Sequence, residues 1–383
     1  MSLPSRKVGK IRRPVRSSWF SLAFVVFFTI SLLVPASSSG IASPENPGSR
    51  VYLPLAAHSF RNGSPLILGV YSPAYLGTQS AIDTNLKSLD TWAGKGNSLA
   101  GMFLDFNDPN PFYNVRVPLE LLWNNGYTAF VNLMTTRTAA DIARGKEDAN
   151  IHETAAAFGY WMAQALQEDQ LRFVFLAPLP EANITSGNSY GGDPASFIAA
   201  YRRIQDIFTQ EFAKYQVPFD SISWVFAPNG VDEPGLPTFE AYYPGQDRVD
   251  VVAFSSYNWG YCVGWAYDRW QLGPELYLPF VNRMHLLAPG KPIFISQTAS
   301  TSEYPSHGSF SPSQKNQWFI DAYTYLAGLD GVRAVLYFNI GGECDWEFYK
   351  YGSLQYDGYR AAIGDAGFTY MTPAETRTEF SHP

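Results

Sequence analysis

Residues 172–183, RFVFLAPLPEAN, join a short apolar run to a glutamate that is flanked by proline and asparagine. β-Branched and aromatic residues over this length favour a buried β-strand, and the prolines end it. Seven further runs of this kind occur, at residues 66–71, 99–106, 127–134, 221–227, 249–257, 292–297 and 332–340. The sequence therefore predicts eight strands.

Helical patterns lie between most of these runs and are clearest at residues 151–168, 194–215, 275–287 and 313–326. The second of them has a typical start, with Asp193 as N-cap and Pro194 at the first helical position. The second and fifth connections carry weak helix signals. Eight strands that alternate with helices predict one α/β domain, a (β/α)8 TIM barrel over residues 66–370.

The first 42 residues predict a secretory signal peptide. Six basic residues precede the apolar run at 19–34, and small residues follow it as far as Ala42. An uncleaved membrane anchor is the alternative, because the run is only a little short of the ~20 residues that a spanning helix needs. Both interpretations put the body of the chain outside the cytoplasm, secreted or extracellular. Residues 43–65 are expected to form a linker and residues 371–383 a C-terminal tail.

Net charge narrows the choice of partner. Loss of the signal segment removes six of the 27 basic residues and no acidic residue, which moves the net charge from −7 to −13. An acidic body repels phosphate backbones and argues against nucleic acid, whereas a neutral polysaccharide or oligosaccharide meets no such repulsion. We expect a monomer without a cofactor, and the five scattered histidines have no metal-ligand spacing.

Cys262 and Cys344 are the two cysteines of the chain. In an oxidising compartment they predict one disulfide, with two free thiols as the alternative. They follow the sixth and eighth strand runs, so both are expected on loops at the same end of the barrel. A bridge between them would stiffen two loops that also carry Trp259 and Trp346.

Catalytic groups of such a barrel are expected at the carboxyl ends of its strands. Glu181 ends the fourth run, and a carboxyl group partly withdrawn from water there would have the raised pKa of a general acid. Cleaving a glycosidic bond needs such an acid and, in most enzymes, a second carboxyl group. Other side chains at strand ends are Asp105, Tyr257, Asn258, Trp259, Gln297, Glu303, Asp345 and Trp346.

The chain resembles glycoside hydrolase family 26, the β-mannanase-like barrels of the retaining clan, over most of residues 66–349. The most specific match is Tyr242-Tyr243-Pro244-Gly245 with Val249-Asp250 and Tyr257-Asn258, and residues 180–183 match the acid/base region. The resemblance implies Glu181 as the acid/base, Tyr257 as a hydrogen-bond donor to the nucleophile and Trp346 as an aromatic platform. The expected substrate contacts are Asn183, Tyr257, Asn258, Trp259, Trp346 and Asp105.

Two positions depart from the family's pattern. Pro180 stands where the family usually has a histidine, and Gln297 stands at the nucleophile position. An amide cannot form the glycosyl-enzyme ester and carries no charge to steady the cationic transition state. Loss of a catalytic group typically costs several powers of ten in rate, while much of the binding survives.

Three interpretations follow. The first is an active hydrolase of a β-linked polysaccharide, β-1,4-mannan first and mixed β-glucan or xylan after it, in which Glu303, Asp105 or Asp345 activates water. The second is a carbohydrate-binding barrel that keeps the cleft without the chemistry. The third, an unrelated barrel with a structural Glu181, is the least favoured because the matching segments occur in order.

Overall fold

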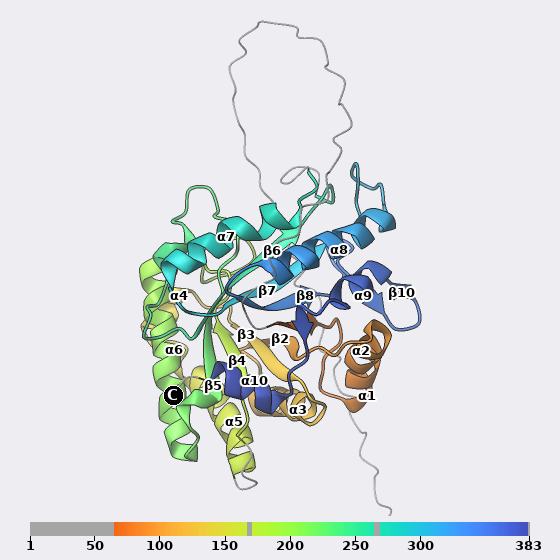
Figure 1. Cartoon of the computed structure of the whole chain (residues 1–383). Helices are drawn as coiled ribbons and strands as arrows, with labels where there is room; N and C mark the ends of the chain where they lie inside the picture. The colour runs from red at the N-terminus through yellow and green to blue at the C-terminus, as the bar shows by residue number, and fades with distance from the viewer. Residues whose placement is uncertain (1–64, 167–170, 264–268, 382–383) are drawn as a thin grey trace, which may run out of the picture.

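The computed structural model describes residues 65–166, 171–263 and 269–381 of the 383-residue chain (Figure 1). The predicted signal peptide and almost all of the linker lie outside these residues. Eight parallel strands form a closed barrel, because β8 pairs with β1 from Ile67–Ala334 to Tyr71–Phe338. The strands are β1 (Leu66–Tyr71), β2 (Leu99–Asp105), β3 (Thr128–Met134), β4 (Val174–Pro178), β5 (Ile222–Phe226), β6 (Val251–Asn258), β7 (Ile293–Ser300) and β8 (Val332–Phe338). The predicted TIM barrel is confirmed.

Helices cover the outside of this barrel. They are α1 (Gln79–Ile82), α2 (Ser88–Ala93), α3 (Pro111–Asn124), α4 (Ala139–Ala143), α5 (Asp148–Leu166), α6 (Pro194–Tyr215), α7 (Gly273–Leu287), α8 (Pro312–Gly328), α9 (Asp357–Ile363) and α10 (Pro373–Phe380), with a π-helical turn η1 (Asp83–Lys87) and 3-10 turns η2 (Phe219–Ser221) and η3 (Phe239–Tyr242). As predicted, α6 starts at an Asp193 cap, whose side chain accepts a hydrogen bond from the Ser196 amide at 3.1 Å.

The two connections with weak helix signals turn out differently. The second contains α3, a full helix whose pattern is interrupted by the buried Pro118. The fifth runs from β5 to β6 through the short turn η3 instead of an α-helix. The barrel wall therefore has an irregular covering after β5.

The C-terminal residues complete the barrel, so the predicted tail at 371–383 is wrong. A short strand, β11 (Phe368–Thr369), pairs with β1, and α10 follows it. Phe380 at the end of α10 is 2% exposed, and its ring centroid lies 5.4 Å from that of Phe175 and 5.2 Å from that of Phe294. Helix α10 therefore closes the amino-terminal end of the barrel.

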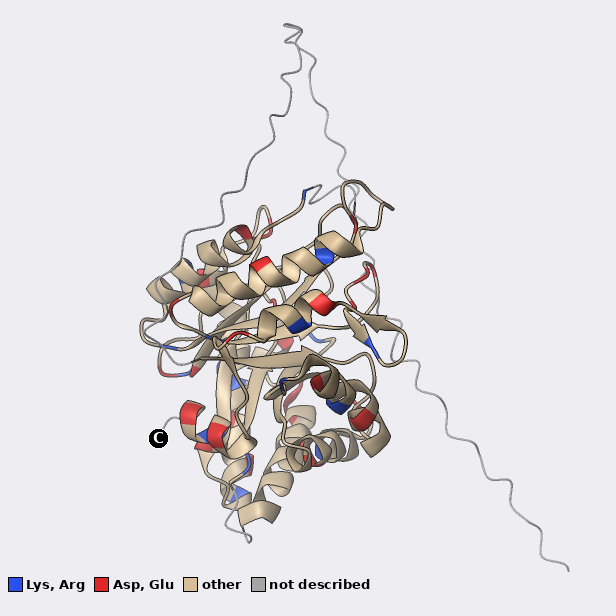
Figure 2. Cartoon of the chain, turned by 45° about the vertical axis from the view of Figure 1, so that its right-hand side comes forward, with Lys and Arg blue, Asp and Glu red and all other residues tan. Residues whose placement is uncertain are grey.

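The outer surface carries mixed charge. Acidic and basic residues are interspersed over the helices in the view of Figure 2. Within the described ranges, no helix has the length and apolarity that a bilayer crossing requires.

We predict that Phe380→Ala lowers the free energy of unfolding by about 3–5 kcal/mol, because it leaves a cavity between two core phenylalanines. Urea denaturation measures the change. Tyr351→Ala is the control, since that ring is 67% exposed and its removal is expected to cost little. A loss below about 1 kcal/mol for Phe380→Ala would mean that α10 is a dispensable tail.

Candidate functional site at the barrel mouth

A strained turn presents Glu181 at the carboxyl end of β4. Leu179 and Glu181 both have left-handed backbone conformations, with φ of 52° and 60°. Such conformations cost about 1–3 kcal/mol each in non-glycine residues and persist only where the surroundings impose them. The Leu179 amide donates to the Leu133 carbonyl on β3 and the Glu181 amide to the Ala227 carbonyl after β5, each at 2.8 Å. The two neighbouring strands thus hold the turn in place.

The Glu181 carboxylate accepts two side-chain hydrogen bonds on one oxygen. The Ser255 hydroxyl on β6 donates to Oε1, and the side-chain amide of Asn229 donates to the same atom at 3.1 Å. Removal from water raises the pKa of Glu181, while these two donors act in the opposite direction. A carboxyl group with a raised pKa, supported by polar neighbours, is suited to deliver a proton.

Asn183 fixes the position of Asn229, the donor to Glu181, and does not line the mouth. It is fully buried. Its Oδ1 accepts a hydrogen bond from the backbone N–H of Asn229 at 2.7 Å, and its Nδ2 donates to the backbone carbonyl of Asn229 at 2.9 Å. Both ends of its side chain are therefore occupied by backbone groups. The expected substrate contact at Asn183 is corrected to a positioning role, in which Asn183 fixes Asn229 and Asn229 contacts Glu181.

A β-bulge directs Gln297 into the barrel. Phe254 pairs with Ile295 and Ser255 with Gln297, so Ser296 is the extra residue on β7. Phe294 faces the barrel interior, and without the bulge the inward position would pass to Ser296. Gln297 was expected at the tip of its strand, but β7 continues to Ser300.

Tyr257 connects Gln297 to the rest of the mouth. Its hydroxyl donates to Gln297 Oε1 at 2.8 Å, and Gln297 is 6% exposed. Since Ser255 lies two residues earlier on the same face of β6, that strand touches both candidate residues, Glu181 through Ser255 and Gln297 through Tyr257. Glu181, Tyr257 and Gln297 thus gather at one end of the barrel.

The next residue on β6 has another role. Asn258 is fully buried, its Nδ2 donates to Ser300 Oγ at 2.9 Å, and its Oδ1 accepts from the Gln271 amide at 2.9 Å. Its side chain faces away from Tyr257 because successive strand residues point to opposite faces. The expected substrate contact at Asn258 is therefore corrected to a loop-anchoring role.

Aromatic rings form a continuous cluster along one side of the mouth, from β2 through β1 and β8 to β6. Neighbouring centroids lie 5.0–6.4 Å apart, and we call these rings the aromatic cluster: Phe103, Tyr71, Phe338, Tyr257, Trp346 and Trp259. Phe103 is 41% exposed although it lies within a strand, and no sequence signal distinguished it from a core phenylalanine. Trp346 is only 5% exposed, so it supports Tyr257 and Trp259 and offers little open surface.

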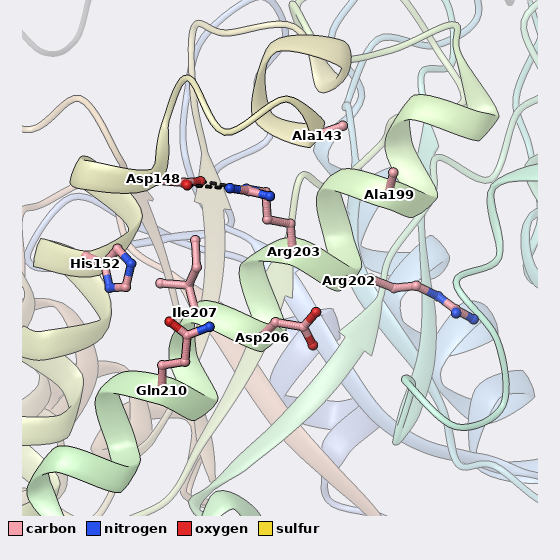
Figure 3. A pocket seen from close by; sticks show the side chains of 9 residues that line it. All are labelled: Ala143, Asp148, His152, Ala199, Arg202, Arg203, Asp206, Ile207 and Gln210. Atoms are coloured by element: carbon pink, nitrogen blue, oxygen red, sulfur yellow. Dashed lines mark hydrogen bonds and ion pairs between the residues drawn. The ribbon is translucent and has the colours of Figure 1, made fainter.

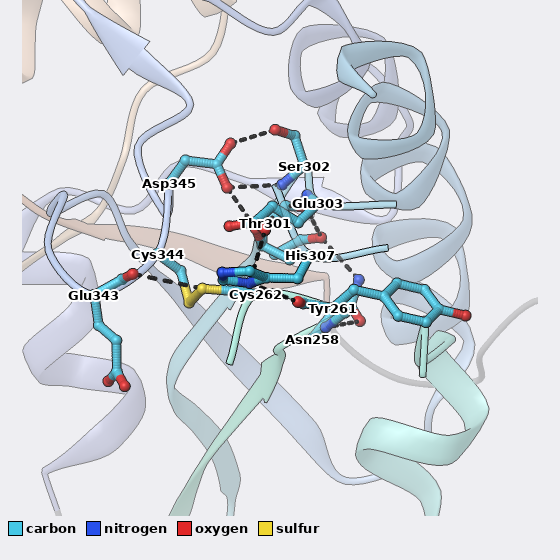
Figure 4. Close-up of a disulfide and its surroundings, with 12 residues drawn as sticks. Asn258, Tyr261, Cys262, Thr301, Ser302, Glu303, His307, Glu343, Cys344 and Asp345 are labelled. Atoms are coloured by element: carbon cyan, nitrogen blue, oxygen red, sulfur yellow. Dashed lines mark hydrogen bonds and ion pairs between the residues drawn. A yellow bond between two sulfur atoms is a disulfide. The ribbon is translucent and has the colours of Figure 1, made fainter. Parts of the chain in front are cut away.

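The three loops that follow β6, β7 and β8 are joined to one another by a disulfide and hydrogen bonds (Figure 4). The predicted disulfide is present between Cys262 and Cys344, with a Cα–Cα distance of 6.0 Å. Asp345 accepts hydrogen bonds from the Thr301 hydroxyl at 2.5 Å and from the Ser302 amide at 2.8 Å. Buried Lys315 on α8 donates to the backbone carbonyls of Asp345 and Glu347, on either side of Trp346.

The three carboxylates considered as a second catalytic group, Asp345, Glu303 and Asp105, differ in their hydrogen-bond partners and in their position relative to Glu181. Asp345 is held by Thr301 and Ser302, and Glu303 is 7% exposed with its carboxylate bonded to the Gly308 amide. Asp105 at the end of β2 is partly buried and accepts from the Asn107 amide at 2.8 Å. Buried Tyr190 lies close enough to Glu181 and Asp105 for both charges to raise its pKa further. Asp105 is thus the one of these three at the Glu181 side of the mouth.

A separate hollow of about 380 Å³ lies on the outer wall, between α4, α5 and α6 (Figure 3). Asp148 and Arg203 form a two-bond ion pair across it, and Arg202 donates to the Pro244 carbonyl. None of its lining residues is Phe, Tyr or Trp, and none belongs to a strand end. It is therefore not part of the barrel-mouth site. Within the described part of the chain, no group of three His, Cys, Asp or Glu residues could hold a metal ion.

Several solved structures with similar folds are mannanases. The catalytic domain of the Bacillus sp. JAMB-750 GH26 endo-β-1,4-mannanase superposes with a TM-score of 0.59 at 11% identity, covering 83% of this chain and 90% of that chain. A modular endo-β-1,4-mannanase from Cellulomonas fimi gives 0.57 at 14% identity, with 83% and 74% covered. A β-mannanase from a symbiotic protist of the termite Reticulitermes speratus, complexed with gluco-manno-oligosaccharide, gives 0.51 at 16%, with 81% and 89% covered. These likenesses establish the fold.

One curated protein is related in sequence. Endoglucanase H of Acetivibrio thermocellus is 27% identical over 305 residues, which cover 77% of this chain and 30% of the endoglucanase. The chain thus spans about 30% of the length of that relative. No protein-family model matches the chain. The chain has the (β/α)8 barrel of the family 26 mannanases and is a distant relative of endoglucanase H.

Proposed function

We propose that this protein is a secreted, monomeric β-glycan-binding barrel of glycoside hydrolase family 26 type, which holds its ligand at the mouth but lacks the second half of the hydrolytic pair. The observation that carries the proposal is the pair at β4 and β7, in which Glu181 is a partly buried acid and Gln297 is a neutral amide. β-1,4-Mannan and glucomannan are the first ligands to test, and mixed β-glucan is the second.

Several properties of the mouth favour a neutral sugar chain. The exposed ring of Phe103 and the partly exposed rings of Tyr257 and Trp259 offer flat apolar area, which suits the CH faces of sugars. The Asp105 carboxylate would repel an anionic glycan. The choice of mannan and glucan rests on the proteins that are similar in fold or sequence, which include mannanases and an endoglucanase. The disulfide suits an oxidising compartment, as secretion implies.

Gln297 leaves the chemistry incomplete. Glu181 with its raised pKa could protonate the leaving oxygen, but Gln297 offers no carboxylate to attack the anomeric carbon or to balance the cationic transition state. The acceptor that Tyr257 needs is still present, since an amide oxygen accepts the hydroxyl hydrogen as a carboxylate oxygen does. Binding is therefore expected to survive a loss of turnover.

Hydrolysis with Asp105 as base is the second candidate. It is favoured by the position of Asp105 on the Glu181 side of the mouth, where both charges act on Tyr190. In that mechanism Asp105 would activate a water on the opposite face of the sugar from Glu181, and the product would have inverted configuration.

We predict that the wild-type protein binds mannohexaose without releasing reducing sugar from mannan, and that Gln297→Glu restores turnover by several powers of ten. Adding Glu181→Gln to that variant is expected to abolish the restored activity, because the leaving group then lacks its proton donor. Calorimetry measures binding and a reducing-sugar assay measures turnover.

The outcomes separate the two candidates. Wild-type turnover that Asp105→Asn removes, with inverted product, would replace the binding barrel by the Asp105 mechanism. A wild-type protein that neither binds nor cleaves mannan, glucomannan or β-glucan would overturn the proposed function.

We predict that Ser255→Ala raises the pKa of Glu181 further, because it removes a donor that stabilises the ionised carboxylate. The pKa of Glu181 is already above its unfolded value, so its contribution to stability is present at low pH and is lost as pH rises through the folded pKa. The pH dependence of the Glu181 carboxyl carbon shift in NMR spectra measures the change. Ser256→Ala is the control, since the Ser256 hydroxyl donates to the Leu276 carbonyl and away from Glu181. An unchanged or lowered pKa in Ser255→Ala would contradict the assigned hydrogen bond.

A further inference from the structure

We propose that Tyr75 and Tyr113 form a distal sugar-stacking subsite, which takes the part of a neutral β-linked hexose chain that extends beyond the barrel mouth on its β1–β2 side. The inference rests on the proposed function, because it assigns more of the same ligand to a second surface. It concerns residues that neither the fold nor the Glu181–Gln297 pair requires.

The two tyrosines lie at the correct end of the barrel. Tyr75 is in the segment after β1 and Tyr113 is in the first turn of α3, which follows β2, so both come after the carboxyl ends of adjacent strands. Tyr75 is four residues beyond Tyr71, a member of the aromatic cluster, so their Cα atoms are at most about 14 Å apart. Tyr75 therefore lies near the aromatic cluster, within the reach of one extended sugar chain.

Hydrogen bonds fix Tyr75 beside α3. Its hydroxyl donates to Asn114 Oδ1 at 3.3 Å, and Asn114 Nδ2 donates to Asp108 Oδ2 at 2.6 Å. Asp108 is itself held, since its Oδ1 accepts from the Asn110 amide at 2.7 Å. Partial burial together with nearby Tyr113 and Asp108 raises the pKa of Tyr75 to about 12. The tip of Tyr75 thus lies next to the residue that follows Tyr113.

Gly77 makes room for the Tyr75 ring. A Cβ atom at position 77 would lie 2.0 Å from Tyr75 Cε1, so the ring lies directly over the glycine backbone. A ring that is supported from below and bonded at its tip loses little further rotamer freedom on binding. The Tyr75 position is thus organised before any ligand arrives.

Exposure indicates that these rings have little part in the core. Tyr75 is 49% exposed and Tyr113 is 50% exposed, and neither belongs to the hydrophobic core. Exposed tyrosines that lie together present flat apolar faces and polar tips, which match the CH faces and hydroxyls of a hexose. The nearby Asp108 carboxylate accepts hydrogen bonds and repels anions, so the fitting ligand is an uncharged glycan.

The test compares a long and a short ligand in calorimetry. In the Tyr75→Ala/Tyr113→Ala double variant we expect mannohexaose to bind about tenfold more weakly than to the wild type, while mannobiose affinity stays unchanged. The short ligand is expected to occupy only the mouth. Gly77→Ala should weaken mannohexaose in the same sense, because the new methyl group displaces the Tyr75 ring.

The control is Tyr75→Phe/Tyr113→Phe, which keeps both rings and removes only the hydroxyls, and it is expected to retain most of the mannohexaose affinity. Unchanged mannohexaose affinity in the alanine double variant would overturn the distal subsite and leave the proposed function intact. Equal loss for both ligands would also overturn it, since the effect would then not be distal. Failure of the wild type to bind either ligand would overturn the subsite together with the proposed function.

Discussion

The partial burial of the Glu181 carboxylate is the constraint on which the barrel mouth depends. An ionised group withdrawn from water is costly unless donors compensate it, and the compensation here comes from separate parts of the chain. Ser255 belongs to β6, and Asn229 follows β5 and is held by Asn183. Backbone bonds to β3 and to the end of β5 impose the left-handed turn. Because each support comes from another element, the acid can be placed only when β3, β4, β5 and β6 have come together.

Strand β6 explains how the site keeps its shape with an amide at position 297. Ser255 binds Glu181 and Tyr257 binds Gln297, so one strand sets the position of both groups. A carboxylate and an amide differ little in size, and both accept a hydrogen bond from the tyrosine. Exchange of one for the other removes charge but leaves the packing undisturbed. Binding and turnover can therefore separate at this residue without any change in the fold.

Local patterns predicted the regular part of the structure well. All eight strands start within two residues of the predicted positions, and α6 has the predicted bounds. The β7 bulge could not be predicted, because it depends on pairing with strands distant in sequence. The roles of Asn183 and Asn258 were missed for the same reason, since burial and partners are tertiary properties. By contrast, α10 had a readable signal in Thr372-Pro373-Ala374-Glu375, a capping box with proline at the first helical position.

The closure of the barrel by its last segment has a consequence for synthesis. Among the elements of the barrel, β1 leaves the ribosome first, whereas its partner strands β8 and β11 and the ring of Phe380 leave it last. Until then the interior phenylalanines of β4 and β7 have no cover, and the open edge of β1 can pair wrongly. The barrel is thus exposed to aggregation until its last segment has been synthesised, and ring closure is expected to be a late step in its folding.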